Sequence, residues 1–130
     1  MECLFCDRDR LNPITVFEDE IVVAFMDIDP INEGHILIMP QRHYLDVDEI
    51  PDEVLMHLTL ISKRIVAALK KTYNPDGYSI MQNGGVFNDV GHYHMHIFPR
   101  YKDDGFSWNF VEDTACVNVE IANRIKEHIK

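Results

Sequence analysis

Three histidines occupy every second position of the stretch GHYHMHIFPR, at positions 92, 94 and 96. On a β-strand, side chains two residues apart point to the same face, whereas on a helix they would spread around the circumference. The residues between the histidines are apolar or aromatic, as expected for the side of a strand that packs against a core. We therefore predict a strand over His92–Arg100, with His92, His94 and His96 lining its polar face.

Imidazoles gathered on one face of a strand have three interpretations. They can form a solvated, hydrogen-bonded surface, they can chelate a metal ion as three protein ligands with an open fourth position, or the central one can act as a nucleophile. The loop NGGVFNDVG, Asn83–Gly91, leads directly into the strand, and its glycines let the backbone approach a ligand closely. Backbone N–H groups there could bind phosphate oxygens without any basic side chain. The spacing of the histidines leaves all three interpretations open.

The composition limits the class of protein. A chain of 130 residues with 46% hydrophobic residues has the size and core-forming content of one domain, which we expect to span residues 1–130. Its net charge of -10 argues against binding to nucleic acid or to an anionic membrane surface, because both require basic patches. The N-terminus has no signal-peptide pattern and no apolar run reaches the length of a membrane span, which predicts a soluble, cytoplasmic protein.

The rest of the pattern predicts the elements that carry the histidines. Runs rich in valine, isoleucine and phenylalanine indicate strands, and apolar residues at spacings of three and four over Pro51–Tyr73 indicate the main helix. The other expected elements are a hairpin over Ile14–Pro30, a third strand over His35–Met39, a fourth over Tyr78–Gln82, the histidine strand, and a second helix over Val117–Ile129. This order predicts an α+β fold, in which an antiparallel sheet of about five strands carries its helices on one face.

Two of the three cysteines form the pattern Cys3-x-x-Cys6, which is a spacing of metal ligands and of redox-active thiols. The alternative is that both thiols pack as small hydrophobic side chains. A closed zinc site needs four ligands, so two more would have to come from elsewhere in the chain. An odd number of cysteines without a secretion signal does not suggest a disulfide framework, and we expect Cys116 to be an ordinary core or boundary residue.

The histidine strand resembles the signature of the histidine triad (HIT) family, His-φ-His-φ-His-φ-φ with φ apolar, over His92–Phe98. Further stretches resemble the same family: CLFC near the start, AFMDIDP, GHILIMPQRH, and PRY after the triad. The resemblance implies a HIT-like α+β fold, a homodimer, and binding of a purine nucleotide that is cleaved or transferred at its α-phosphate. The substrates would be nucleoside 5'-phosphate derivatives such as phosphoramidates, dinucleoside polyphosphates or nucleotidyl conjugates.

Within this resemblance, His94 matches the nucleophile that forms a nucleotidyl-imidazole intermediate, which water or another acceptor then cleaves. A neighbouring backbone carbonyl would fix the tautomer of His94 so that its free nitrogen faces phosphorus. His96 would hydrogen-bond the phosphate or the leaving group, and His92 completes the triad. His35, in GHILIMP, matches an upstream histidine that supports the triad.

The resemblance also implies where the nucleoside lies. Asp27, in FMDID, matches an acidic residue that takes the ribose hydroxyls, with Phe25 and Ile28 around the base. The chemistry is suitable, because a carboxylate accepts two hydroxyl donors and apolar side chains cover the faces of a purine.

The loop before the triad departs from the family pattern. Many members have Gly-Gln-Ser/Thr-Val there, whereas this chain has Phe87–Val90. The candidate nucleotide-binding side chains of the loop are Asn83, Asn88 and Asp89. Asn88 can replace an amide donor, and Asp89 would bring negative charge near the phosphate unless it accepts a hydrogen bond.

In the branch of the family with an N-terminal CxxC, the resemblance implies a zinc ion held by Cys3, Cys6, His43 and His92. Its role would be structural, joining the N-terminal segment to the catalytic strand. Two other functions stay open. One is a zinc-dependent hydrolase in which the triad itself binds the metal, although no general-base carboxylate adjoins the triad. The other is a nucleotide-binding or interaction protein with slow chemistry.

Overall fold

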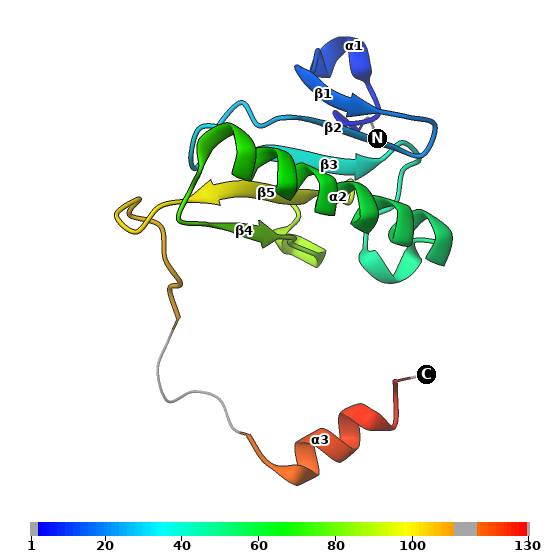
Figure 1. Cartoon of the computed structure of the whole chain (residues 1–130). Helices are drawn as coiled ribbons and strands as arrows, with labels where there is room; N and C mark the ends of the chain where they lie inside the picture. Colours follow the sequence, from blue (N-terminus) through cyan, green and yellow to red (C-terminus); the bar gives the residue numbers. More distant parts are fainter. Residues whose placement is uncertain (1–2, 111–116, 130) are drawn as a thin grey trace.

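Five antiparallel strands form one sheet in the computed structural model, which describes residues 3–110 and 117–129 (Figure 1). The strands follow the order β1-β2-β3-β5-β4 across the sheet. They are β1 (Thr15–Glu18), β2 (Val22–Met26), β3 (Ile36–Pro40), β4 (Gly77–Met81) and β5 (Met95–Arg100), with short 3-10 turns at Val47–Glu49 and Gly85–Phe87. The predicted α+β fold with a five-stranded antiparallel sheet is confirmed.

Asp19 lies in the turn of the β1–β2 hairpin and shapes it. The carboxylate of Asp19 accepts hydrogen bonds from the backbone N–H groups of Ile21 and Val22, at 2.9 and 2.8 Å. Nε2 of His57, on the long helix, lies 2.6 Å from the other carboxylate oxygen of Asp19. Burial raises the pKa of Asp19, but these hydrogen bonds outweigh it and hold the pKa below its usual value. One carboxylate therefore shapes the turn and ties it to the helix.

The long helix α2 (Asp52–Tyr73) covers one face of the sheet (Figure 1). Pro51 precedes its first turn, where two acidic residues lie at the positive end of the helix dipole. Asn74 ends the helix in the left-handed conformation, at φ 48°. The buried residues of the core between α2 and the sheet are Val22, Ala24, Ile36, Ile38, Ile50, Leu58, Ile61, Ile65, Leu69, Tyr93 and Ile97.

The N-terminal segment covers the opposite face of the sheet at β2 and β3. It contains the short helix α1 (Arg8–Leu11), which the sequence pattern did not predict, because 4 residues are too few to show a helical period. Asp7 caps this helix by accepting a hydrogen bond from the N–H of Arg10 at 3.1 Å. A second apolar cluster lies beneath the segment and consists of Phe5, Val23, Phe25, Leu37 and Met39.

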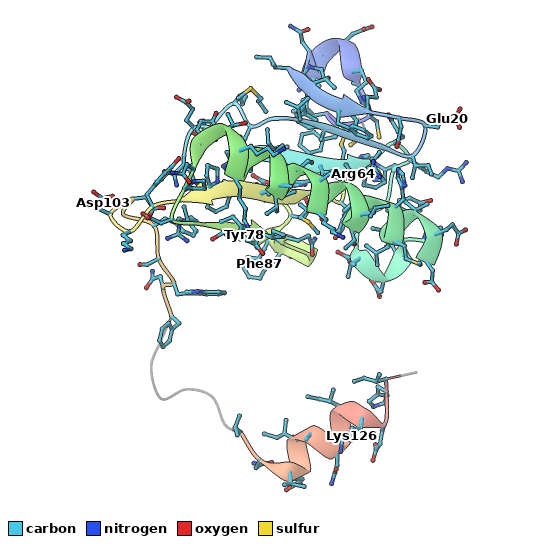
Figure 2. The ribbon with its side chains drawn as sticks, viewed as in Figure 1. Glu20, Arg64, Tyr78, Phe87, Asp103 and Lys126 are labelled. Atoms are coloured by element: carbon cyan, nitrogen blue, oxygen red, sulfur yellow. The ribbon has the colours of Figure 1, made fainter. Side chains whose placement is uncertain are left out.

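The C-terminal helix α3 (Val119–Lys126) lies apart from the sheet (Figure 1), and Figure 2 shows its side chains, Lys126 among them, separated from those of the sheet. No residue of this helix is buried. The expectation that both helices cover one face is therefore wrong, because among the described helices α2 covers that face and α3 does not. Cys116 lies outside the described residues. Among the described helices, none combines the length and apolar character that crossing a membrane requires.

Strand β5 begins at Met95, so the predicted strand over His92–Arg100 is wrong in its first three residues. Pro40, on β3 two positions beyond the last pair of this ladder, has no N–H to donate to β5, and its carbonyl accepts from Nε2 of His92 at 3.0 Å. The N–H of Tyr93 donates instead to the carbonyl of Tyr44, at 2.7 Å. The first two histidines of the triad therefore lie just before the strand, and the third lies within it.

Candidate functional site

Four histidines from two parts of the chain meet on the face of the sheet opposite α2. His35 immediately precedes β3, and the triad histidines precede β5 or lie in it. The imidazole centroids of His94 and His96 are 5.0 Å apart, and those of His35 and His96 are 5.1 Å apart. Between the triad histidines, Tyr93 belongs to the core under α2, as does Ile97 after them. Histidines and apolar side chains thus separate onto two faces as predicted.

His94 is buried, and a backbone carbonyl fixes its tautomer. Its Nδ1 lies 2.8 Å from the carbonyl oxygen of His92, which can only accept, so Nδ1 carries the proton and Nε2 keeps its lone pair. The ring of Phe5 packs edge-on against this imidazole, with centroids 5.1 Å apart. Nε2 is therefore the nitrogen of His94 that can act as a nucleophile.

His35 and His96 are linked by directed hydrogen bonds. The N–H of Ile31 donates to Nδ1 of His35 at 3.0 Å, so the proton of His35 is on Nε2. That Nε2 lies 2.9 Å from Nδ1 of His96 and 3.3 Å from Oδ2 of Asp27. Nδ1 of His96 therefore accepts, and the proton of His96 is on Nε2, where it can be donated to a ligand. We term Asp27, His35 and His96 the histidine relay.

Burial favours the neutral form of His35, His92 and His96. It lowers the pKa of His92 to about 4. Burial also lowers the pKa of His96 to about 4, and repulsion from the protonated forms of His94 and His35 acts in the same direction. Burial also lowers the pKa of His35, with nearby carboxylates acting in the opposite direction. Neutral rings are required for the hydrogen-bond directions above, because a protonated histidine has no acceptor nitrogen.

Two cysteines and two histidines converge beside the triad. The Sγ atoms of Cys3 and Cys6 each lie 3.5 Å from Nδ1 of His92. Sγ of Cys6 also lies 3.3 Å from Nδ1 of His43. All four ligand atoms are within 4.8 Å of one another. We term these residues the cysteine–histidine cluster, and they are the ligand set that the family resemblance implied.

The donors of this cluster suit zinc, which favours thiolates and imidazoles in a closed site of four ligands. His92 donates its Nε2–H to the carbonyl of Pro40 at 3.0 Å, which leaves the lone pair of Nδ1 directed at both sulfur atoms. A metal-binding histidine typically makes this kind of second hydrogen bond through its other ring nitrogen. The residues present therefore fit a zinc ion.

The histidine relay also holds three ligand-type atoms within 4.8 Å of one another, yet its donors do not suit a metal ion. Nε2 of His35 carries a proton, because Nδ1 of the same ring accepts from the backbone, so it has no lone pair to offer. The triad is no better suited, since Nδ1 of His92 faces the cysteines and Nδ1 of His94 faces a carbonyl. This geometry gives no support to a catalytic zinc bound by the triad.

A pocket of about 360 Å³ opens beside His94 and His96. Several residues predicted to bind nucleotide line it: Phe25, Asp27, Ile28 and Asp89. One wall comes from the N-terminal segment, whose role no motif in the sequence indicated. The residues of that wall are Leu4, Phe5, Arg10, Leu11 and Pro13. The pocket is therefore apolar on one side apart from Arg10, and carries carboxylates and imidazoles on the other.

Asn83 and Asn88, also predicted to bind nucleotide, do not line this pocket. The side chain of Asn88 is buried, and its Oδ1 accepts from the N–H groups of Val90 and Gly91 at 3.3 and 3.0 Å. Asn88 therefore shapes the loop before the triad, and its contact with nucleotide stays a prediction. Asn83 lines a separate cavity of about 630 Å³ between β4 and the segment that contains Trp108.

The HIT domain family model matches residues 10–103, which include the sheet, α2 and the triad. The chain belongs to the HIT family. Among its HIT relatives, an uncharacterised HIT-like protein of Methanocaldococcus jannaschii is 40% identical over 129 residues, covering 96% of this chain and 97% of that protein. The crystal structure of a HIT family protein from Bacillus anthracis matches with a TM-score of 0.88 at 30% identity, covering 99% of this chain and 98% of that chain.

Two further HIT relatives are known by their activity or by their metal. The adenosine 5'-monophosphoramidase HNT1 of Saccharomyces cerevisiae is 35% identical over 102 residues, covering 75% of this chain and 62% of that protein. The crystal structure of a zinc-bound histidine triad family protein from Mycobacterium smegmatis matches with a TM-score of 0.75 at 31% identity, covering 87% of this chain and 85% of that chain. The HIT domain is thus shared with a phosphoramidase and with a zinc-bound protein.

Proposed function

We propose that this HIT protein binds purine nucleoside 5'-phosphate derivatives and cleaves them at the α-phosphate through a covalent nucleotidyl intermediate on His94. One observation carries the proposal. The carbonyl of His92 accepts the Nδ1–H of His94 at 2.8 Å, so in the neutral ring the lone pair is on Nε2, and this side chain lines the pocket. A neutral imidazole held in one tautomer beside a pocket of this size is suited to attack a bound phosphate.

The reaction would take two steps. In the first, Nε2 of His94 bonds to the α-phosphorus while the bond from phosphorus to the leaving group breaks, and the leaving amine takes a proton from solvent. His96, whose proton is on Nε2, donates a hydrogen bond to the phosphate or the leaving group. In the second, water attacks phosphorus and returns one proton to solvent, the P–N bond breaks, and the nucleoside monophosphate leaves with His94 neutral again. His35 fixes the tautomer of His96 and is therefore a positioning residue.

The pocket offers different surroundings to the parts of a nucleotide. Phe25 and Ile28 would contact the base, and Asp27 would accept hydrogen bonds from the ribose hydroxyls. Asp89 lines the pocket beside the triad. Its carboxylate would repel a leaving group that carries negative charge, so we expect amine leaving groups to be favoured over phosphate ones. The relationship to the yeast monophosphoramidase supports the same choice of first substrate.

We further propose that the cysteine–histidine cluster holds a structural zinc ion. Its two thiols and two imidazoles are a suitable donor set, and the zinc-bound relative from Mycobacterium smegmatis supports this choice of metal. Bound there, the ion would supply a cross-link between the N-terminal segment and the chain just before β5. It would take no part in the chemical steps above.

A homodimer would cover two exposed apolar surfaces. β4 is an edge strand, with Tyr78 and Ile80 exposed by 47% and 44%. An apolar edge strand is a template for pairing with a second copy of the chain. α3 exposes Val119 and Ile125 in a similar way. We expect a dimer in light scattering after size exclusion, a monomer for Ile80→Lys, and no change for Val16→Lys on the opposite edge strand. A dimer that survives both substitutions would exclude the β4 edge.

Mass spectrometry of the intact protein tests the chemistry, after rapid mixing with an adenosine 5'-phosphoramidate and without acid. Wild type should gain the mass of an AMP group, whereas His94→Ala should bind AMP without gaining it. His57→Gln is the matched control, because His57 lies on α2 outside the pocket, and it should form the adduct. If wild type binds AMP but gives neither adduct nor hydrolysis, the chain is a nucleotide-binding protein without this chemistry.

A further inference from the structure

The N-terminal segment, residues 3–13, forms one wall of the pocket beside the triad. Its apolar residues in that wall include Leu4, Phe5 and Leu11. Phe5 is only 4% exposed, and the centroid of its ring lies 5.5 Å from that of Phe25, the residue proposed to contact the base. A base bound against Phe25 would therefore also lie against the N-terminal segment.

This wall is attached to the sheet by side chains. Within the described chain, the backbone hydrogen bonds of residues 3–12 all close inside the segment, and the first one that reaches a strand is accepted by Ile14. The guanidinium of Arg8 contacts Gln41 and, at 3.5 Å, Glu18. The cysteine–histidine cluster is a further attachment, and it joins the segment to the loops that carry His43 and His92.

In the sequence, the wall residues Leu4 and Phe5 lie between the two cysteines. A metal ion bound to both sulfur atoms therefore fixes the part of the segment that touches the pocket. One of the two histidine ligands, His92, also accepts the Nδ1–H of His94 through its carbonyl. The cluster is thus connected to both the apolar wall and the nucleophile.

We propose that zinc at the cysteine–histidine cluster controls the affinity of the adjacent pocket for nucleotide, in addition to stabilising the N-terminal segment. This inference rests on the nucleotide-binding function proposed above. Without the ion, the segment loses the metal ligands on both sides of Leu4 and Phe5 and is held by apolar packing and by Arg8, so the wall shields the base from water less well. Thermodynamic linkage requires the reciprocal effect, so bound nucleotide raises the affinity for zinc by the same factor.

The core between α2 and the sheet does not use this segment, which contributes Phe5 only to the second apolar cluster on the opposite face. The buried cluster between α2 and the sheet contains no residue from the range 3–13. Removal of the metal should therefore leave the strands and α2 in place. A loss of nucleotide affinity without loss of secondary structure distinguishes the proposed control from a purely structural role of the ion.

Calorimetric titration of the full-length protein with AMP, before and after removal of zinc by a chelator, tests the proposal. We expect the Kd for AMP to rise by about tenfold or more in the metal-free protein, with the far-ultraviolet circular dichroism retained. The same Kd in both folded forms would overturn the control by zinc and leave the proposed function intact. Failure of AMP to bind either form would overturn both.

A variant of the wall decides the matter if chelation unfolds the chain. Leu11→Ala removes apolar surface from the wall without touching a ligand of the cluster, and it should weaken AMP binding by roughly threefold to tenfold while one zinc per chain is retained. Leu60→Ala, at an exposed position of α2, is the matched control and should bind AMP like wild type. Equal AMP affinity in Leu11→Ala and Leu60→Ala would overturn the role of the wall and with it the proposed control.

Discussion

The cysteine–histidine cluster and the histidine relay each gather ligand-type atoms within 4.8 Å of one another, on the same face of the sheet. They differ in the direction of one hydrogen bond. In the cluster, His92 donates from Nε2 to a carbonyl at 3.0 Å and keeps a lone pair for a metal. In the relay, Nδ1 of His35 accepts a hydrogen bond from a backbone N–H at 3.0 Å, so Nε2 carries the proton and donates it in a hydrogen bond to His96.

The backbone therefore decides what each imidazole can do. A carbonyl partner leaves the other nitrogen with its lone pair, which is directed at a metal site in His92 and available to phosphorus in His94. An N–H partner leaves the other nitrogen of His35 as a donor. Distances alone would assign both the cysteine–histidine cluster and the histidine relay to metal binding. The hydrogen-bond partner at the other nitrogen of each ring distinguishes the two.

The largest expected effect is on zinc affinity. Cys6→Ser removes one of four ligands and should weaken zinc binding by about a hundredfold or more, measured by competition with a chromophoric chelator. His35→Gln should leave zinc affinity within about twofold, because His35 is no ligand of the cluster.

The opposite result would contradict the assignment of zinc to the cysteine–histidine cluster. If His35→Gln lost zinc while Cys6→Ser retained it, the metal would belong to the relay. Circular dichroism of both variants checks that each is folded before the comparison is made.

The next effect concerns the rate of cleavage. His35→Ala removes the donor that fixes the tautomer of His96, so we expect kcat for the phosphoramidate to fall by about tenfold to a hundredfold, with zinc content unchanged. His35→Gln should recover part of the rate, since glutamine carries both a donor and an acceptor.

Nitrogen-15 NMR of the imidazole groups gives a second measurement of the same effect. The proton of His96 should be on Nε2 in wild type and in Cys6→Ser, and should be shared between both nitrogens in His35→Ala. A single Nε2–H tautomer in all three proteins would mean that His35 does not position His96.

The parts of the fold that local patterns specify could be predicted from the sequence. The period of apolar residues predicted α2 to within one residue at its start, and the β-branched runs predicted the hairpin and β3. The alternation of histidines with apolar residues predicted which side chains of the triad stretch face the core and which lie on the opposite face. Each of these signals depends on residues that are close together in the chain.

The parts that depend on distant neighbours could not be predicted. β5 starts late because of Pro40 on the adjacent strand, and Asn88 bonds to its own loop although its amide could equally have faced a ligand. A helix over Val117–Ile129 was predicted from the sequence, but nothing there specified that α3 lies apart from the sheet. Leu4 and Leu11 line the pocket without any motif, because their role follows from the position of the whole N-terminal segment.

The smallest expected effect is on stability at mildly acidic pH. Burial lowers the folded-state pKa of His92 and His96 to about 4, below the ordinary value of 6.5. The unfolded chain therefore binds more protons between these values, so stability that is complete above about pH 6.5 is lost as the pH falls towards about 4. We expect the Tm to fall by about 5 °C or more between pH 7 and pH 5.

Substitutions separate the contributions of the cysteine–histidine cluster and of the histidine relay to this pH dependence of the Tm. His96→Gln cannot be protonated and should reduce the slope of Tm against pH with zinc bound, whereas Cys6→Ser should keep the part that comes from the relay. A Tm that does not change over this range would show that the fold does not hold the rings neutral. The acceptor roles of Nδ1 in His35 and His96 would then be wrong, because each of them requires a neutral imidazole.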